Sequence, residues 1–202
     1  MDSVPSPQRV TLTPGARRAL AAAGRLFYER GIHAVGVDLI AAEAGVTKKT
    51  LYDRFGSKEQ IVVEYLADRD ERWRAFLAGR LDAVGDSPER RLTAIFDASR
   101  DWTAENSAKG CSMVNAHAEI SDPSHPAYAI IIGQKRWMLD LFTGVCRDAS
   151  VRDPETLART VMLLHEGALV AHGLQVFPDA VRLASEQATA LLAAAAVPNR
   201  ER

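Results

Sequence analysis

The sequence predicts an all-α protein of about nine helices. Three observations carry this prediction. Apolar residues recur at helical spacing along most of the 202 residues, glycine and proline divide that pattern into segments, and no segment shows the alternation of apolar and polar residues that a half-buried strand requires. The hydrophobic share of 47% is sufficient for a real core.

The first two helices have recognisable ends. Thr13 can cap the first helix, Pro14 fits its first position, and Gly31 ends it. A second, short helix is expected over residues 37–44, and Gly45 makes the tight turn that follows. Both helices are therefore bounded by residues that favour a helix end.

The next two helices follow without a long loop. A third helix is expected to begin at Thr47, whose hydroxyl can cap it, and to continue to Phe55, where Gly56 stops it. The fourth begins at residues 57–60, a capping-box pattern, and its apolar positions continue to about Val84.

Five further helices are expected after the turn at residues 85–88. Pro126 and Pro154 are expected in the first turns of two of them, and Asp153 can cap the second. The expected ranges are about 88–106, 111–120, 126–148, 154–175 and 179–196. The resulting division is a disordered lead-in over 1–12, a small domain over 13–57, a larger domain over 58–196 and a tail over 197–202.

The composition indicates a cytoplasmic protein that does not cross a membrane. No run reaches the roughly 18 apolar residues that a transmembrane helix requires. The N-terminal MDSVPSPQRV contains no apolar segment of the kind found in signal peptides. Cys111 and Cys146 are therefore expected to be free thiols in a reducing compartment.

Charge is distributed unevenly along the chain, although the formal net charge is only -1. Residues 1–58 contain nine Lys and Arg against five Asp and Glu, whereas residues 59–202 contain sixteen against twenty-one. The N-terminal part is therefore basic and the remainder acidic. This asymmetry suggests that the N-terminal part meets a polyanion and the remainder does not.

The stretch AAEAGVTKKTLYDRF, residues 41–55, joins two short helices through a turn that contains a glycine. This is the helix-turn-helix arrangement, whose second helix enters the major groove of DNA. Leu51 and Phe55 are four residues apart and would face inward, so the polar and cationic side chains between them would face outward.

The outward side chains suit two roles in DNA binding. Lys49 and Thr50 lie near the start of the third helix and are the candidates for reading base edges. The candidates for phosphate contacts, or for flanking the same face, are Thr47, Lys48, Tyr52, Arg54 and Lys58. The alternative is a solvated basic face on a structural helix pair.

Several short elements between Thr13 and Leu66 occur together in this part of the chain. They are Gly31 after the first helix, Ile40-Ala41 in the second, Ala44-Gly45-Val46 in the turn, Leu51-Tyr52 and Phe55 in the third, and Ser57-Lys58-Glu59 at the start of the fourth. Together they resemble the TetR family of one-component bacterial transcriptional regulators. The resemblance implies a homodimer that binds a palindromic operator in double-stranded DNA and responds to a small organic effector, most often as a repressor.

One position departs from the pattern of that family. The family usually has Thr or Ser at the start of the second helix, where the hydroxyl caps the helix and touches phosphate, whereas this chain has Val35 and Gly36. Glycine is an acceptable cap but has no hydroxyl. A phosphate contact at Gly36 would therefore have to come from backbone N–H groups at the helix start.

The resemblance implies that the larger domain binds the effector and forms the dimer. A site for a small, largely apolar molecule is lined mainly by apolar and aromatic groups with a few polar anchors. The candidates are Trp102, Cys111, Asn115, His117, Met138, Phe142, His165 and Glu166. The alternative for each is an ordinary place in the core, since methionine and aromatic stripes at helical spacing usually pack there.

The last two helices carry apolar stripes of heptad-like spacing, with small residues toward their ends. Two such helices can approach closely in a four-helix bundle. The resemblance implies a twofold dimer, and we therefore expect its interface on these helices. Its expected residues are Leu157, Val161, Leu164, Ala168 and Ala171 on one helix and Val181, Ala184, Ala188 and Leu191 on the other. The alternative is packing within one chain.

A regulator that responds to a metal or to oxidants is an alternative to one with an organic effector. His165 and Glu166 do not form a zinc-protease motif because position 169 is Leu, although His172 and His117 could join His165 at a metal. Cys111 could sense oxidants only if it were exposed and activated by a cationic neighbour, and otherwise it packs as a small hydrophobic residue. No cofactor or metal is expected, and an all-α enzyme or a helical scaffold is a more distant alternative.

Overall fold

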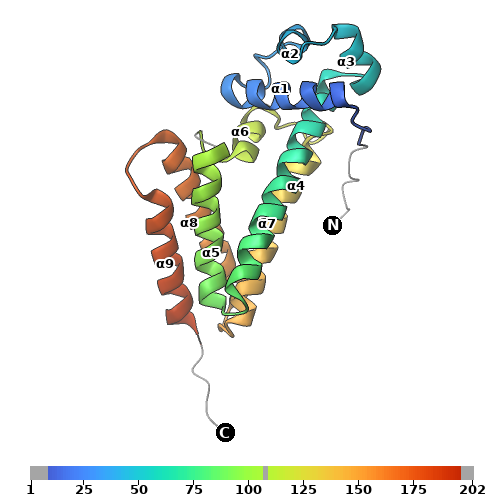
Figure 1. Cartoon of the computed structure of the whole chain (residues 1–202). Coiled ribbons are helices and arrows are strands. Elements are labelled where there is room, and N and C mark those ends of the chain that lie inside the picture. The colour runs from blue at the N-terminus through green and yellow to red at the C-terminus, as the bar shows by residue number, and fades with distance from the viewer. Residues whose placement is uncertain (1–8, 107–108, 197–202) are drawn as a thin grey trace. The chain divides into compact units, whose positions relative to one another are not determined.

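The structure, a computed structural model, describes residues 9–106 and 109–196, and over these ranges the chain forms nine α-helices (Figure 1). They are α1 (Pro14–Arg30), α2 (Val37–Ala44), α3 (Lys48–Phe55), α4 (Lys58–Val84), α5 (Pro88–Asn106), α6 (Ser112–Glu119), α7 (Tyr128–Asp148), α8 (Pro154–Leu174) and α9 (Ala180–Ala195). The predicted all-α fold is confirmed, and each predicted helix is present.

The helix ends follow the predicted caps at most positions. α8 begins at Pro154, and the carboxylate of Asp153 accepts the backbone N–H of the third residue after it at 3.1 Å. α7 begins at Tyr128 and not at Pro126, because the preceding residues form a turn in which the N–H of Tyr128 donates to the carbonyl of His125 at 2.9 Å. The prediction of Pro126 in the first turn was therefore wrong by two residues.

The chain divides into two compact units. Unit 1 comprises residues 1–72 and 112–134, and unit 2 comprises residues 73–111 and 135–202. α4 and α7 each contribute residues to both units. The boundary predicted after residue 57 falls inside unit 1. Of the predicted lead-in only residues 9–12 are described, and the predicted tail, 197–202, lies outside the described residues.

In unit 1, the two shortest helices pack on α1. α1, α2 and α3 contact one another, and α2 and α3 have eight residues each. Isolated helices of that length are not stable in water, so they depend on the apolar side chains that they bury. The largest buried side chains of these three helices are Leu20, Leu26, Phe27, Ile40, Leu51 and Phe55.

In unit 2, one continuous apolar core joins the long helices. α9 packs against both α5 and α8 (Figure 1). Full burial of a leucine or phenylalanine side chain contributes about 1.5–3 kcal/mol. The fully buried large side chains of this core are Leu77, Leu92, Ile95, Phe96, Met138, Phe142 and Leu192.

The turn before α6 lies directly against the backbone of α8. A Cβ atom on Gly173 would lie 2.7 Å from the backbone nitrogen of Gly110, and a Cβ on Gly110 would lie 2.6 Å from the carbonyl oxygen of Leu169. Gly110 also has a φ of +78°, which disfavours other residues. Both glycines are therefore required for this close approach within unit 2.

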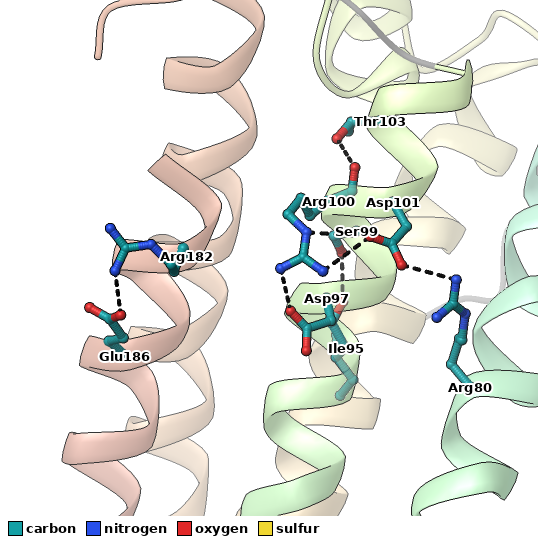
Figure 2. Close-up of polar contacts among 9 residues, drawn as sticks. All are labelled: Arg80, Ile95, Asp97, Ser99, Arg100, Asp101, Thr103, Arg182 and Glu186. Carbon is teal, nitrogen blue, oxygen red and sulfur yellow. Dashed lines mark hydrogen bonds and ion pairs between the residues drawn. The ribbon is translucent and has the colours of Figure 1, made fainter. Parts of the chain in front are cut away.

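Ion pairs lie on the outer face of α5 in unit 2. Figure 2 shows Arg100 of α5 beside Asp97 and Asp101, at 2.7 and 3.1 Å, and Asp101 also pairs with Arg80 of α4 at 2.9 Å. Exposed pairs of this kind contribute little to stability, and they keep the outer face of α5 polar. Among the helices of the described residues, none is long and apolar enough to cross a membrane.

The segment before α1 is anchored on α4 within unit 1. Glu64 is 0% exposed, and its carboxylate accepts hydrogen bonds from Nε of Arg9 at 2.8 Å and from the backbone N–H of Val10 at 2.7 Å. Nε2 of Gln60 donates a third at 3.1 Å. A buried carboxylate is tolerated only with such partners.

Replacing Glu64 with glutamine should destabilise unit 1. The change keeps the size of the side chain but removes the charge and puts an amide group where an acceptor is needed, so we expect a loss of about 1–3 kcal/mol in the free energy of unfolding. Urea denaturation measures it. The control is Glu71→Gln, since Glu71 also pairs with Arg9 but is exposed. Equal losses for the two variants would contradict this assignment.

Candidate nucleic-acid interface

α3 has one buried face and one exposed face. Leu51 and Phe55 are buried in unit 1, as predicted, whereas Lys48, Lys49 and Tyr52 are exposed on the other side. Tyr52 is an aromatic side chain that is 45% exposed. The exposed face therefore offers cations, hydroxyls and an aromatic ring together.

The turn before α3 has the geometry that the sequence predicted. Gly45 has a φ of +63° in the left-handed region and ends α2. Thr47 then caps α3, because its Oγ1 accepts the backbone N–H of Thr50 at 3.1 Å. The two threonine hydroxyls are 2.8 Å apart. One of these hydroxyls donates to the other, so the pair keeps one hydroxyl proton for a further partner.

Two candidate cations already have carboxylate partners. Nζ of Lys48 donates to Asp38 of α2 at 2.9 Å, and Nζ of Lys49 donates to Asp53 at 2.7 Å. The hydrogen bond and the charge of Asp38 raise the pKa of Lys48. Both pairs are exposed, so each holds its lysine weakly. A phosphate or a guanine edge could replace either carboxylate at little cost.

The remaining candidates flank α3. Arg54 is exposed in its last turn. Gly36 is the N-cap of α2 with no side-chain hydrogen bond, as its lack of a hydroxyl requires. Lys58 is half-buried, and its Nζ lies 3.5 Å from the carbonyl oxygen of His33, a long contact toward unit 1 itself. Thus Lys58 has a partner within the protein that the sequence pattern did not indicate.

Part of the predicted effector set lies in one polar chain in unit 2, in which Ser99 and His165 are buried and Cys111, Lys135 and Glu166 are half-buried. Oγ of Ser99 lies 2.8 Å from Nε2 of His165, and Nδ1 of His165 lies 3.4 Å from Glu166. Both carboxylate oxygens of Glu166 accept from Nζ of Lys135 at 2.8 Å, and Nζ is 3.1 Å from Sγ of Cys111. The sequence missed Ser99 and Lys135.

The signal for Lys135 was present in the sequence. Lys135, Met138 and Phe142 are spaced i, i+3 and i+7, so the lysine stands on the apolar stripe of α7. A cation on such a stripe needs a buried partner, and Glu166 is that partner. Only the structure identifies which carboxylate it is.

The charges in this chain stabilise one another. Burial opposes ionisation of Glu166, but the hydrogen bond to His165 and the charge of Lys135 outweigh it and lower the pKa of Glu166 to about 2. Burial likewise opposes the charged form of Lys135, but Cys111 and Glu166 raise its pKa. The Lys135–Glu166 pair is only partly buried, with side-chain exposures of 20% and 21%, so solvent can reach it.

The other effector candidates lie in different surroundings. Met138 and Phe142 are fully buried in the core of unit 2, and the ring of Phe142 lies 5.5 Å from that of His165. Trp102 packs against the rings of two aromatic residues of α4. Asn115 and His117 are exposed on α6 in unit 1. The structure therefore groups Phe142, His165, Glu166 and Cys111 but not the whole set.

The metal and redox alternatives can be compared with the geometry. Within residues 9–106 and 109–196, no group of three or more His, Cys, Asp or Glu side chains could hold a metal ion. Both ring nitrogens of His165 lie near protein partners. Cys111 is half-buried with a cationic neighbour, as a redox role requires, yet Glu166 balances the charge of that cation. Burial raises the pKa of Cys146 to about 11.

The expected dimer residues divide by exposure. Five of them are buried within the single chain, where they pack on other helices of unit 2: Val161, Ala168, Val181, Ala184 and Ala188. Leu157, Leu164 and Ala171 are half-buried, and Leu191 is exposed. The sequence pattern did not distinguish the inner faces of α8 and α9 from their outer faces. The exposed apolar side chains of these two helices include Leu163, Val170, Leu174 and Leu183.

The comparisons with known proteins agree with this geometry. The family model "Bacterial regulatory proteins, tetR family" matches residues 19–65, which include α2, α3 and the turn between them. The HTH-type transcriptional repressor KstR2 of Mycolicibacterium smegmatis is 40% identical over 91 residues, and the HTH-type transcriptional activator FasR of the same organism is 32% identical over 106 residues. The matches cover 43% and 52% of this chain. The chain spans 42% and 47% of those two relatives.

Solved structures extend the likeness to nearly the whole chain. A TetR-family transcriptional regulator from Streptomyces coelicolor is 30% identical and superposes with a TM-score of 0.82, over 93% of this chain and 92% of that one. A tetr-transcriptional regulator from Streptomyces avermitilis is 29% identical with a TM-score of 0.76, over 91% and 98%. These relatives regulate transcription and are not enzymes.

Serine substitutions at the two ends of α2 should have opposite effects. Gly36 has a φ of -83° and open space around a Cβ, so Gly36→Ser adds a capping hydroxyl without strain and should leave the stability equal or higher by a few tenths of a kcal/mol. Gly45→Ser meets no neighbour either, but its left-handed backbone should cost about 1 kcal/mol. Thermal unfolding of both variants measures the difference, and a less stable Gly36→Ser protein would contradict the cap geometry.

The lowered pKa of Glu166 predicts a pH dependence of stability. A carboxylate with a lowered pKa stabilises the folded state fully above its ordinary value of 4.5, and this contribution is lost as the pH falls toward about 2. The contribution is on the order of 3 kcal/mol. We expect the melting temperature of the Glu166→Gln protein to vary less over this pH range than that of the unmodified protein.

The control for this measurement is Glu186→Gln, which removes a carboxylate from the exposed pair with Arg182 (Figure 2). Its pH dependence should match that of the unmodified protein. A Glu166→Gln protein with an unchanged pH dependence would show that Glu166 is not the stabilising carboxylate.

Proposed function

Since this chain belongs to the TetR family of bacterial transcriptional regulators, we propose that it is a homodimeric repressor in the cytoplasm. It binds a palindromic operator through α3, and a small, largely apolar effector bound in unit 2 releases it. The relatives include an activator and a repressor, and the repressor KstR2 has the higher identity over its matched part, which supports a repressor here.

One observation carries the DNA-binding part of the proposal. α3 buries Leu51 and Phe55 and leaves its cations, hydroxyls and Tyr52 exposed on the opposite face. Phosphate contacts require such cations and hydroxyls, and base reading requires side chains near the start of the recognition helix. We assign Lys49 and Thr50 to base edges and Lys48 to phosphate. The excess of basic residues in the N-terminal part supports this assignment.

A dimer is supported by exposed apolar surface on α8 and α9. Leu163 is 75% exposed and Leu174 71%, and with Val170 they are spaced i, i+7 and i+11 along one stripe of α8. Leu183 and Leu191 of α9 are exposed as well. Apolar side chains grouped on one surface indicate an interaction site, and a second copy of the chain fits the twofold symmetry of a palindrome.

The effector is proposed to act on the polar chain in unit 2. In this polar chain, the ring of His165 lies beside the rings of Phe96 and Phe142, which supply the apolar surroundings that a small organic molecule prefers. An effector that replaced one hydrogen-bond partner in this polar chain would alter the pairing of Glu166 and Lys135. It would thereby favour a state of the dimer whose two α3 helices no longer fit the operator.

Alanine substitutions at Lys48 and Lys49 test the DNA-binding proposal. A phosphate contact releases counterions, so Lys48→Ala should weaken binding to all sequences. It should also reduce the slope of log K against log salt concentration by about two for a dimer, or by about one if a monomer binds. Lys49→Ala should change the sequence preference by about 1–3 kcal/mol at one base pair per half-site. Fluorescence anisotropy with labelled duplexes measures both.

The matched control is Arg90→Ala, because Arg90 is an exposed cation of unit 2. It should leave both affinity and salt slope unchanged. If Lys48→Ala behaves as this control does, Lys48 does not contact phosphate and the assignment fails.

A further inference from the structure

We propose that Glu119 is a positioning residue for operator recognition: its carboxylate holds the turn between α1 and α2 and makes the placement of the reading helices depend on α6. This proposal rests on the proposed function and concerns its regulation. It is carried by contacts that lie entirely within unit 1. Neither the resemblance nor the comparisons assign a role to this residue.

The turn after α1 presents two adjacent backbone donors. The N–H of Gly31 closes α1 by donating to Phe27, and the N–H groups of Ile32 and His33 then point to the carboxylate of Glu119 at 2.8 and 2.7 Å. Nδ1 of His33 lies 3.2 Å from the same carboxylate. Successive backbone N–H groups form a concave site for an anion, and Glu119 occupies it.

Gly31 is required for this contact in two ways. Its φ of +92° turns the chain where other residues are strained. A Cβ at Gly31 would also lie only 3.2 and 3.3 Å from the two carboxylate oxygens of Glu119. The glycine therefore leaves the space in which the carboxylate reaches both donors.

The position of Glu119 is unfavourable for its own helix. It is the last residue of α6, where the helix dipole disfavours a negative charge. The donors that offset this cost belong to the turn at residues 31–33, not to α6. The residue therefore stabilises the association between α6 and the turn and does not stabilise the helix that carries it.

Only a short segment separates the turn from the reading helices. α2 begins at Val37, and the four residues from His33 can span at most about 14 Å. Val35 is buried in this segment. α2 is then linked to α3 by the turn at Gly45 and by the ion pair of Lys48 with Asp38. The short segment therefore limits how far the turn can move without displacing α2, and a displaced α2 would move α3 through these two links.

The contact can be released because it is not enclosed. A cavity of about 290 Å³ adjoins Glu119 and is bounded also by His33, Lys58 and His125. The Glu119 side chain is 26% exposed. A small shift of α6 can thus move the carboxylate into this space, where water replaces the two backbone donors.

The start of α6 is linked by the chain to the polar groups of unit 2. α6 has eight residues and is about 12 Å long. The residues immediately before it are Gly110, which lies against the backbone of α8, and Cys111, whose Sγ accepts from Lys135. An effector that alters Lys135 or α8 therefore acts on the residues that precede α6, and Glu119 is at the other end of that helix.

The test compares three variants. Glu119→Ala removes the acceptor, Glu119→Gln keeps the shape and one acceptor oxygen, and Asp122→Asn is the control, because Asp122 bounds the same cavity but accepts from Ser124. The probes are a duplex that the unmodified protein selects from a random-sequence library and a duplex of shuffled sequence. Amide hydrogen exchange at Ile32 and His33 is measured by NMR on the same proteins.

We expect Glu119→Ala to lower the ratio of affinities for the selected and shuffled duplexes about tenfold or more, and Glu119→Gln to lower it less. Exchange of the two amides should accelerate in the same order. Binding to the shuffled duplex and its salt dependence should not change, since phosphate contacts remain. Asp122→Asn should match the unmodified protein in every measurement.

An unchanged affinity ratio in either Glu119 variant, with unchanged exchange at Ile32 and His33, would overturn the proposal. Glu119→Gln decides the question if the alanine variant does not fold. Loss of affinity for both duplexes together would also overturn it, because Glu119 would then only support the fold. If the unmodified protein selects no sequence, the proposed function fails, while the exchange rates still test the contact itself.

Discussion

The short length of α2 and α3 is the constraint on which the rest of unit 1 depends. An eight-residue helix does not hold its shape in water, so each must be fixed by what it buries and by how it is capped. Leu51 and Phe55 use the inner face of α3 for this purpose. Thr47 and Gly45 fix its start. Its exposed side chains are therefore available for a partner, because Lys48 and Lys49 are held only by exposed carboxylates.

The same constraint explains why α1 and α6 matter to the interface although no residue of either helix is assigned to DNA. The reading helices take their positions from the turn at residues 31–33 and from the core beneath them. Glu119 and Lys58 both contact that turn. The carboxylate of Glu119 accepts from two backbone N–H groups of the turn, and Nζ of Lys58 lies near one of its carbonyl oxygens. Recognition of the operator is thus proposed to depend also on contacts within the protein that do not touch the DNA bases.

Most of the fold was predictable from the sequence, because its signals are local. Caps such as Thr13, Thr47 and Asp153 and the glycines after α1, α2 and α3 set helix ends within two residues of those observed. The partners of buried charges were not predictable. Lys135 stands on an apolar stripe that is visible in the sequence, but its pairing with Glu166 depends on how α7 and α8 pack. The same holds for Glu119, which lies 86 residues from His33.

The central claim is that α3 and the residues at its start form the DNA-contacting surface. Amide chemical shifts of the protein, recorded by NMR as a selected duplex is added, test it most directly. We expect the largest changes at Gly36 and at residues 47–54, with smaller changes at the 31–33 turn. Largest changes in unit 2, or none in residues 47–54, would contradict it.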